Sequence, residues 1–107
     1  AWETAAAIET KSPLAVKVTL AALRRARARG PVPGALEEAL DTEYRIGLRL
    51  LAGHDFREGI RAQVIDKDRS PRWNPPTLAE VGREDVEACF APLDAEELGL
   101  AAGVAAP

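Results

Sequence analysis

The sequence contains no methionine, one cysteine and one histidine. Because translation begins at methionine, we expect that the chain is a processed or clipped product. The single cysteine, Cys89, cannot form a disulfide within the chain, and no cysteine or histidine pair has the spacing of metal ligands. The sequence therefore predicts no metal site and a reduced, cytoplasmic setting.

Long apolar runs are also lacking. No stretch approaches the roughly 20 apolar residues of a membrane-spanning helix, and the N-terminus lacks the basic and then apolar pattern of a signal peptide. No segment alternates apolar and polar residues for long enough to predict a strand. With 107 residues, 47% of them hydrophobic and 29% charged, the chain is expected to form a single all-α domain without a membrane partner.

Residues 1–10 are predicted to be the end of a preceding helix. Helical periodicity and start signals predict three further helices within residues 13–66. Ser12 as N-cap and Pro13 at the first position start the first helix, which is expected to end near Arg29. The second, residues 35–52, is expected to pair with it as an antiparallel hairpin. Its apolar stripe recurs about every fourth residue and consists of Leu36, Leu40, Tyr44, Leu48 and Leu51.

A third helix, which we call the docking helix, is predicted to follow Gly53. That glycine is expected to adopt positive φ, and Asp55 with Glu58 is expected to form a capping box. Phe56, Ile60 and Val64 recur every fourth residue, which predicts one apolar stripe that lies against another surface.

The remainder of the chain is predicted to be a proline-rich strap and short helices. Residues 67–76 form the strap, because prolines interrupt a helix there. Residues 77–100 are expected to form short helices, two of which begin at capping boxes, Thr77 with Glu80 and Asp94 with Glu97. Residues 101–107 are expected to be a frayed tail.

The same region resembles a known family. The resemblance covers residues 11–98, and it is strongest at Gly53-His54-Asp55-Phe56, Glu58-Gly59, Arg61-Ala62, Ile65-Asp66-Lys67-Asp68 and Pro71-x-Trp73. Shorter matches flank it at Lys11-Ser12-Pro13, Glu43-Tyr44-Arg45 and Leu78-Ala79-Glu80-Val81. These residues are similar to the C-terminal signature of the 3-hydroxyisobutyryl-CoA hydrolases, a branch of the enoyl-CoA hydratase/isomerase (crotonase) superfamily.

The resemblance implies a supporting role. In that superfamily the oxyanion hole and the acidic residues that act on acyl-CoA thioesters lie in a spiral α/β core that precedes this region. The implied partners are that catalytic core and further copies of the chain in a homo-oligomer. No catalytic residue, metal or cofactor is implied within the chain, whose parent would act on an acyl-CoA. Lys67 is the one residue implied as a contact to a CoA phosphate. The same resemblance leaves open a parent that is an enoyl-CoA hydratase or isomerase.

Individual side chains do not form a recognisable catalytic set. His54 is the only histidine, and a general base needs a positioned partner and a pocket, so a structural or exposed role is predicted. Its neighbour Asp55 is expected to point away from it. Cys89 is predicted to be a small core residue. Asp66 and Asp68 are predicted to form a solvated ion-pair cluster with the basic residues Lys67 and Arg69.

Nucleic-acid binding is the competing interpretation. Four arginines, Arg24, Arg25, Arg27 and Arg29, end the first long helix and could contact phosphates, with Trp73 as a stacking platform. The calculated pI of about 5.2 opposes this interpretation. Cations near a helix C-terminus also interact favourably with the helix dipole, which accounts for the cluster without a ligand. Nucleic acid is therefore an unlikely partner.

Overall fold

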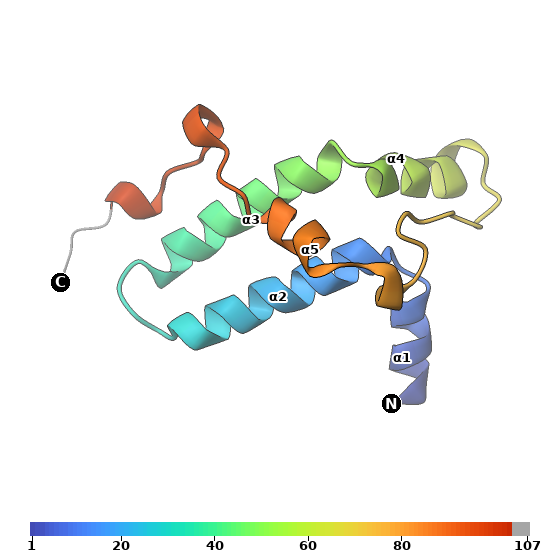
Figure 1. Ribbon diagram of the computed structural model, residues 1–107, viewed down its shortest axis with the longest axis horizontal. Helices are drawn as coiled ribbons and strands as arrows, with labels where there is room; N and C mark the ends of the chain where they lie inside the picture. The colour runs from blue at the N-terminus through green and yellow to red at the C-terminus, as the bar shows by residue number, and fades with distance from the viewer. Residues whose placement is uncertain (104–107) are drawn as a thin grey trace.

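The structure, a computed structural model, describes residues 1–103, and this part of the chain contains helices and no strands (Figure 1). The predicted all-α class is confirmed. No helix in this range is long and apolar enough to cross a membrane. The elements are, in order, α1 (Trp2–Glu9), α2 (Pro13–Arg29), α3 (Ala35–Leu51), α4 (His54–Ile60), the π-helical turn η1 (Arg61–Ile65), the 3₁₀ turn η2 (Leu78–Glu80), α5 (Arg83–Cys89) and the 3₁₀ turns η3 (Asp94–Glu96) and η4 (Ala101–Gly103).

Helices α2 and α3 form the predicted antiparallel hairpin (Figure 1). The hydroxyl of Ser12 accepts a hydrogen bond from the amide of Ala15 at 3.3 Å, so the predicted N-cap of α2 is confirmed. Between the helices the chain reverses through Gly30 and Gly34, whose φ angles are 77° and 84°. Glycine adopts this left-handed region without the steric penalty of a Cβ, and the short turn therefore brings the two helices side by side.

A small core lies where α5 packs against the hairpin. Val18, Cys89 and Phe90 are buried together, and Ile46 of α3 packs at their edge. The guanidinium carbon of Arg25 lies 3.6 Å from the centroid of the Phe90 ring, a cation–π contact. The predicted core role of Cys89 is confirmed, and burial raises the pKa of its thiol.

A polar ridge on α3 binds the segment that follows α5. Asp41, Arg45 and Arg49 lie one turn apart along the helix. The Asp41 carboxylate accepts from two backbone amides near residue 100, at 2.8 and 2.9 Å. Arg45 pairs with Glu97, and this hydrogen bond lowers the pKa of the Glu97 carboxyl. Arg49 donates to two backbone carbonyls just after α5, at 3.3 and 2.9 Å. The irregular segment is thus attached to α3 by hydrogen bonds.

The predicted capping boxes are wrong. Gly53 has φ −84°, not a positive φ, and the residue before α4 makes no side-chain cap. Thr77 makes no side-chain cap at η2, and the N-cap of η3 is Leu93, while Asp94 has φ 57°. At α4, Asp55 and Glu58 bond to other segments instead, as described below.

A capping hydrogen bond forms at a position that the sequence pattern missed. The Asp85 carboxylate accepts from the amide of Gly82, at 2.9 Å, at the start of α5. The expected frayed tail falls largely outside the described residues, because only 101–103 are described, as η4.

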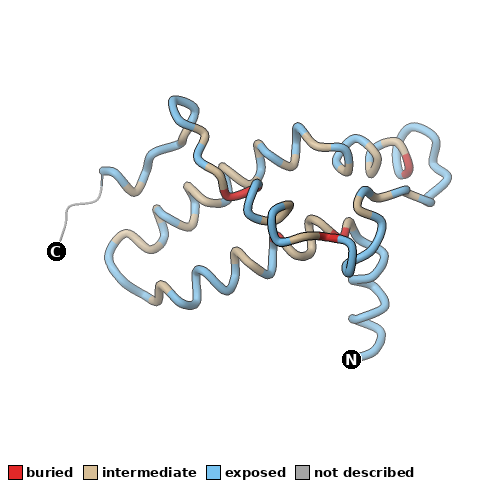
Figure 2. The backbone as a smooth tube through the Cα atoms, in the orientation of Figure 1, coloured by how far each residue is buried: buried red, intermediate tan, exposed pale blue. Residues whose placement is uncertain are grey.

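The molecule is more extended than a compact domain of its length. Its radius of gyration is 15.9 Å, whereas a compact domain of this size has about 13 Å. Figure 2 shows that buried residues are confined to a few short stretches of the chain. Within the described part the buried apolar residues are Val18, Ala62, Val81, Cys89 and Phe90. Most apolar side chains therefore remain exposed on the helix surfaces.

Replacing the central core residue tests this description. The side chain of Val18 is 1% exposed, and that of Val32, in the turn between α2 and α3, is 50% exposed. Val18→Ala removes two buried methyl groups and should lower the free energy of unfolding by about 2 kcal/mol. Val32→Ala, the same truncation at the surface, should change it by less than about 0.5 kcal/mol. Urea unfolding followed by circular dichroism measures both, and equal effects would show that the core lies elsewhere.

Candidate functional site: the docking helix and its strap

The docking helix consists of α4 and η1, which follow each other directly, because α4 ends at Ile60 and η1 begins at Arg61. Phe56, Ile60 and Val64 lie along one side of it, and their side chains are 48%, 38% and 63% exposed. Ala62, on another side, is fully buried. The predicted apolar stripe is thus present, and no segment of residues 1–103 covers it.

An apolar groove lies beside this stripe. It has a volume of about 530 Å³ and opens between the start of α2, the end of α3 and the docking helix. Leu14 and Leu50 form part of its floor with Cys89, while Phe56 and Ile60 form a wall. Apolar surface of this extent is rarely left uncovered on a protein in solution, so the groove and stripe together are the candidate interaction surface.

Arg61 is the centre of an ion-pair cluster at the end of the docking helix. Its guanidinium donates to both carboxylate oxygens of Glu58, at 2.8 and 2.7 Å, and to Asp66 and Asp68 at 2.9 and 2.7 Å. These hydrogen bonds raise the pKa of Arg61. Glu58 shows the complementary effect: the bond from Arg61, followed by one from the Arg72 amide, lowers its pKa to about 2.

The strap folds back onto the docking helix through the same carboxylates. Glu58 accepts from the backbone amide of Arg72 at 2.7 Å, and Asp55 accepts from that of Asn74 at 2.9 Å. Between these two anchors, the Trp73 indole donates to the carbonyl of Thr10 at 3.1 Å. The strap therefore connects the docking helix to the junction of α1 and α2.

Trp73 passes close to the docking helix at Gly59. A Cβ at position 59 would lie 3.5 Å from the Trp73 ring, which is ordinary contact distance. Trp73 also lines the groove. The strap thus contributes one aromatic wall to the interaction surface, and its attachment determines where that wall lies.

The predicted candidate residues are only partly brought together. His54 is exposed, as predicted, but its Nδ1 lies 2.8 Å from Asp55, so the expectation that the two point apart is wrong. Ser12 donates to the other oxygen of Asp55 at 2.5 Å. Asp55 therefore lies between the hydroxyl and the imidazole. A serine nucleophile would need its base in direct contact, which this order does not provide.

Asp66 and Asp68 do form an ion-pair cluster, but its cation is Arg61, not the Lys67 and Arg69 that were predicted. Lys67 and Arg69 both have positive φ, and the structure of residues 1–103 shows no hydrogen bond or ion pair of the Lys67 side chain. The role of Lys67 toward CoA stays a prediction. The same part of the chain holds no group of three metal-ligating side chains. The three-residue spacing of Glu58 and Arg61, with acids five and seven residues further on, was the sequence signal for the cluster.

Comparison with known proteins identifies the family. The profile described as enoyl-CoA hydratase/isomerase matches residues 1–90. The chain belongs to the enoyl-CoA hydratase/isomerase family. Among curated relatives, the mitochondrial 3-hydroxyisobutyryl-CoA hydrolase of Gallus gallus is 44% identical over 94 residues, which are 88% of this chain and 23% of that protein.

Two crystal structures of family members resemble the fold. A carnitinyl-CoA dehydratase from Mycobacterium thermoresistibile is 48% identical with a TM-score of 0.67, over 81% of this chain and 23% of that one. An enoyl-CoA hydratase from Rhodobacter sphaeroides 2.4.1 is 49% identical with a TM-score of 0.66, over 78% of this chain and 23% of that one. The chain thus spans less than a quarter of the length of these family members, and it is the helical part that they share.

Removing the Arg61 cation should loosen the docking helix in a pH-dependent way. Glu58 titrates at about 2 instead of its ordinary 4.5, so its stabilising effect is complete above pH 4.5 and is lost as the pH falls toward 2. Arg61→Met should therefore lower the urea midpoint at pH 7, and its difference from wild type should shrink from pH 4.5 downward.

The matched control is Arg57→Met, because Arg57 lies on the same helix and makes no ion pair within residues 1–103. It should leave the midpoint nearly unchanged at every pH. An equal loss in both variants, or a loss for Arg61→Met that is independent of pH, would contradict the assignment of Arg61 as the centre of the cluster.

Proposed function

We propose that the chain is the C-terminal helical region of an enzyme that acts on CoA thioesters, and that it works as a scaffold and association module. The proposed parent activity is hydrolysis of 3-hydroxyisobutyryl-CoA, the reaction named in the curated relatives. One observation carries the proposal: the stripe of the docking helix lies exposed beside an apolar groove, and no other segment of residues 1–103 covers either.

The proposed partner of this surface is the catalytic core of the parent protein. Covering the exposed parts of Phe56, Ile60 and Val64 would contribute on the order of 1 kcal/mol for each side chain. The Arg61 cluster and the Asp55 bonds hold helix and strap in place before any partner binds. Because helix and strap are already ordered in the free chain, binding carries no further entropy cost for ordering them. Even a surface of modest area can therefore bind the catalytic core.

Catalysis itself is assigned to that core. Thioester chemistry needs preorganised donors that face the developing oxyanion, and their loss costs orders of magnitude in rate. In the described residues three polar groups near the groove, the Ser12 hydroxyl, His54 Nδ1 and the Asn74 amide, are committed to Asp55. The chain alone is therefore expected to be inactive toward acyl-CoA.

A second candidate for the parent activity is hydration or dehydration of a CoA thioester. The two structures that resemble this fold are named for a dehydratase and a hydratase, and their identities of 48% and 49% lie in the same range as the 44% and 49% of the hydrolases from Gallus gallus and Danio rerio. The shared helical region supports both candidates, since the chemistry is proposed to lie outside it. The cytoplasmic location also remains a proposal, and the hydrolases among the curated relatives carry "mitochondrial" in their names.

Complementation tests the proposal. The partner is the Gallus gallus hydrolase from which the segment matched by this chain has been deleted. Mixed with the wild-type chain, it should recover hydrolysis of 3-hydroxyisobutyryl-CoA, whereas each component alone should be inactive. With the triple variant Phe56→Ser, Ile60→Ser, Val64→Ser, the recovered hydrolysis rate should be at least about tenfold lower. The polar side chains remove the free energy that burial of the apolar stripe would contribute. Trp2→Ser, which alters an exposed residue of α1, should recover as much as wild type.

Three results would overturn the proposal: turnover by the chain alone, full activity of the deleted enzyme without it, or equal recovery with the triple variant. Parallel assays for hydration of an enoyl-CoA distinguish the two parent activities. They require the deleted enoyl-CoA hydratase of Rhodobacter sphaeroides as the partner.

Lys67 can be tested in the same mixture. If its ammonium binds a CoA phosphate, Lys67→Gln should raise KM for 3-hydroxyisobutyryl-CoA severalfold and leave kcat nearly unchanged. The N-acetylcysteamine thioester lacks the phosphates, so its KM should not change. A similar KM increase for both substrates, or no increase for either, would remove Lys67 from the proposed CoA contacts.

A further inference from the structure

Lys67 lies in the middle of a turn whose other residues are anchored. The turn, residues 66–70, joins the docking helix to the strap. Within residues 1–103 the Lys67 side chain is exposed and makes no hydrogen bond or ion pair. A lysine between two aspartates would ordinarily pair with one of them, because opposite charges this close attract each other even in water. Here both aspartates are engaged elsewhere.

Arg61 engages the two aspartates that flank Lys67. Its Nη1 donates to Asp66 Oδ2 at 2.9 Å and to Asp68 Oδ2 at 2.7 Å, so one guanidinium nitrogen binds the residues on both sides of the lysine. Its Nη2 donates to the Ser70 carbonyl, at the far end of the turn, at 3.5 Å. Because each carboxylate already has a cation, neither is left to pair with Lys67.

Backbone hydrogen bonds anchor the same turn. The Arg69 amide donates to the carbonyl of the fully buried Ala62 at 2.9 Å, and the Ser70 amide donates to Asp68 Oδ1 at 2.9 Å. Lys67 and Arg69 have left-handed φ angles of 57° and 55°, which residues with a Cβ keep only where surrounding contacts require them. The backbone that carries the Lys67 side chain is therefore fixed by contacts of its neighbours.

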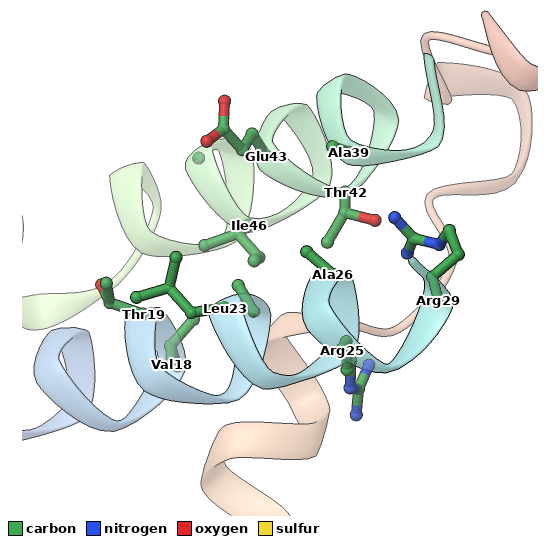
Figure 3. Close-up of a pocket in the computed structure, with 12 residues that line it drawn as sticks. Val18, Thr19, Leu23, Arg25, Ala26, Arg29, Ala39, Thr42, Glu43 and Ile46 are labelled. Atoms are coloured by element: carbon green, nitrogen blue, oxygen red, sulfur yellow. The ribbon is translucent and has the colours of Figure 1, made fainter. Parts of the chain in front are cut away.

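Arg61 differs from the other arginines that form ion pairs within the described residues, because each of those joins a single carboxylate. Figure 3 shows Arg25 and Arg29 on α2, beside the cleft of about 310 Å³ between α2 and α3. Arg25 pairs with Glu87 of α5 and Arg29 with Glu38 of α3, so each connects two helices. The carboxylates of Arg61 all lie on the docking helix and the turn that follows it, so its effect is local.

We propose that Arg61 is a positioning residue for Lys67. It fixes the turn that presents the lysine, and it occupies the carboxylates that would otherwise compete with a phosphate for the ammonium. The inference rests on the proposed function, in which Lys67 contacts a CoA phosphate, and Arg61 itself does not touch the substrate. The planar fork of an arginine can bind Glu58, Asp66 and Asp68 together, whereas the compact ammonium of a lysine cannot.

Arg61→Lys separates positioning from charge, because it keeps the cation and removes the fork. In the mixture of a saturating amount of the chain with the deleted Gallus gallus hydrolase, KM for 3-hydroxyisobutyryl-CoA should rise at least about threefold, with kcat nearly unchanged. KM for the N-acetylcysteamine thioester, which lacks the phosphates, should not change. If only the charge of Arg61 mattered, both KM values would equal those of wild type, and the proposal would be overturned. A rise for both substrates would indicate a general loss of structure and would overturn it as well.

A double-mutant cycle tests whether Arg61 acts through Lys67. When two residues act as one unit, the effects of their substitutions do not add. In the Lys67→Gln background, Arg61→Lys should therefore cause no further increase in KM for the CoA thioester. A further increase as large as that in the wild-type background would show that Arg61 acts by another route.

The order of the turn in the chain alone gives a measurement that does not depend on activity. Amide heteronuclear NOE values of Lys67 and Asp68 should match those of the docking helix in wild type and should fall in Arg61→Lys. The matched control is Arg57→Lys, since Arg57 lies on the same helix and makes no ion pair within residues 1–103, and it should leave these values unchanged. A turn that is mobile in wild type, or equally ordered in Arg61→Lys, would overturn the proposal.

The outcomes distinguish this inference from the proposed function. If Lys67→Gln raises KM for the CoA thioester and Arg61→Lys does not, Lys67 binds the phosphate without help from Arg61, and only this inference fails. If Lys67→Gln has no effect, the proposed phosphate contact fails, and this inference fails with it. A mixture that recovers no hydrolysis would overturn both.

Discussion

The hydrogen bonds of Glu58 and Asp55 to the strap are the constraint on which the interaction surface depends. Both carboxylates lie on the docking helix, and both accept from backbone amides of residues 72–74, while Arg61 holds Glu58 in position. A strap with three prolines forms no regular hydrogen-bond ladder of its own, so its course must be set by side chains. Because it is attached at two points, Trp73 is held against Gly59 and completes one wall of the groove.

Polar attachment recurs because the apolar core is too small to order the rest of the chain. Core contacts order the hairpin and α5, whereas the segment after α5 is ordered by the ridge of Asp41, Arg45 and Arg49. Exposed ion pairs contribute little free energy individually. Here they act in clusters on neighbouring backbone groups, so their effect is to fix geometry. Many of the apolar side chains that would normally order these segments by packing face outward instead. This is expected if their partners belong to other chain segments or other copies.

The sequence predicted the helices well and their polar partners poorly. Periodicity and the Ser12-Pro13 start signal located α2 and α3, since these depend on residues close together along the chain. The capping boxes failed because that pattern considers only residues three apart. Asp55 instead bonds to the amide of Asn74, 19 residues away, and Glu58 to that of Arg72, 14 residues away. These hydrogen bonds between distant residues depend on the path of the strap, and local sequence patterns do not determine that path.

The central claim is that the stripe of the docking helix is an internal surface of a larger assembly. Carbene footprinting, which labels exposed side chains, tests it directly when it is applied to the chain alone and to its mixture with the deleted Gallus gallus hydrolase. Labelling of Phe56, Ile60 and Val64 should fall on mixing, while that of Trp2, which is 77% exposed on α1, should stay constant. Unchanged labelling of the stripe in a mixture that has recovered activity would contradict the account.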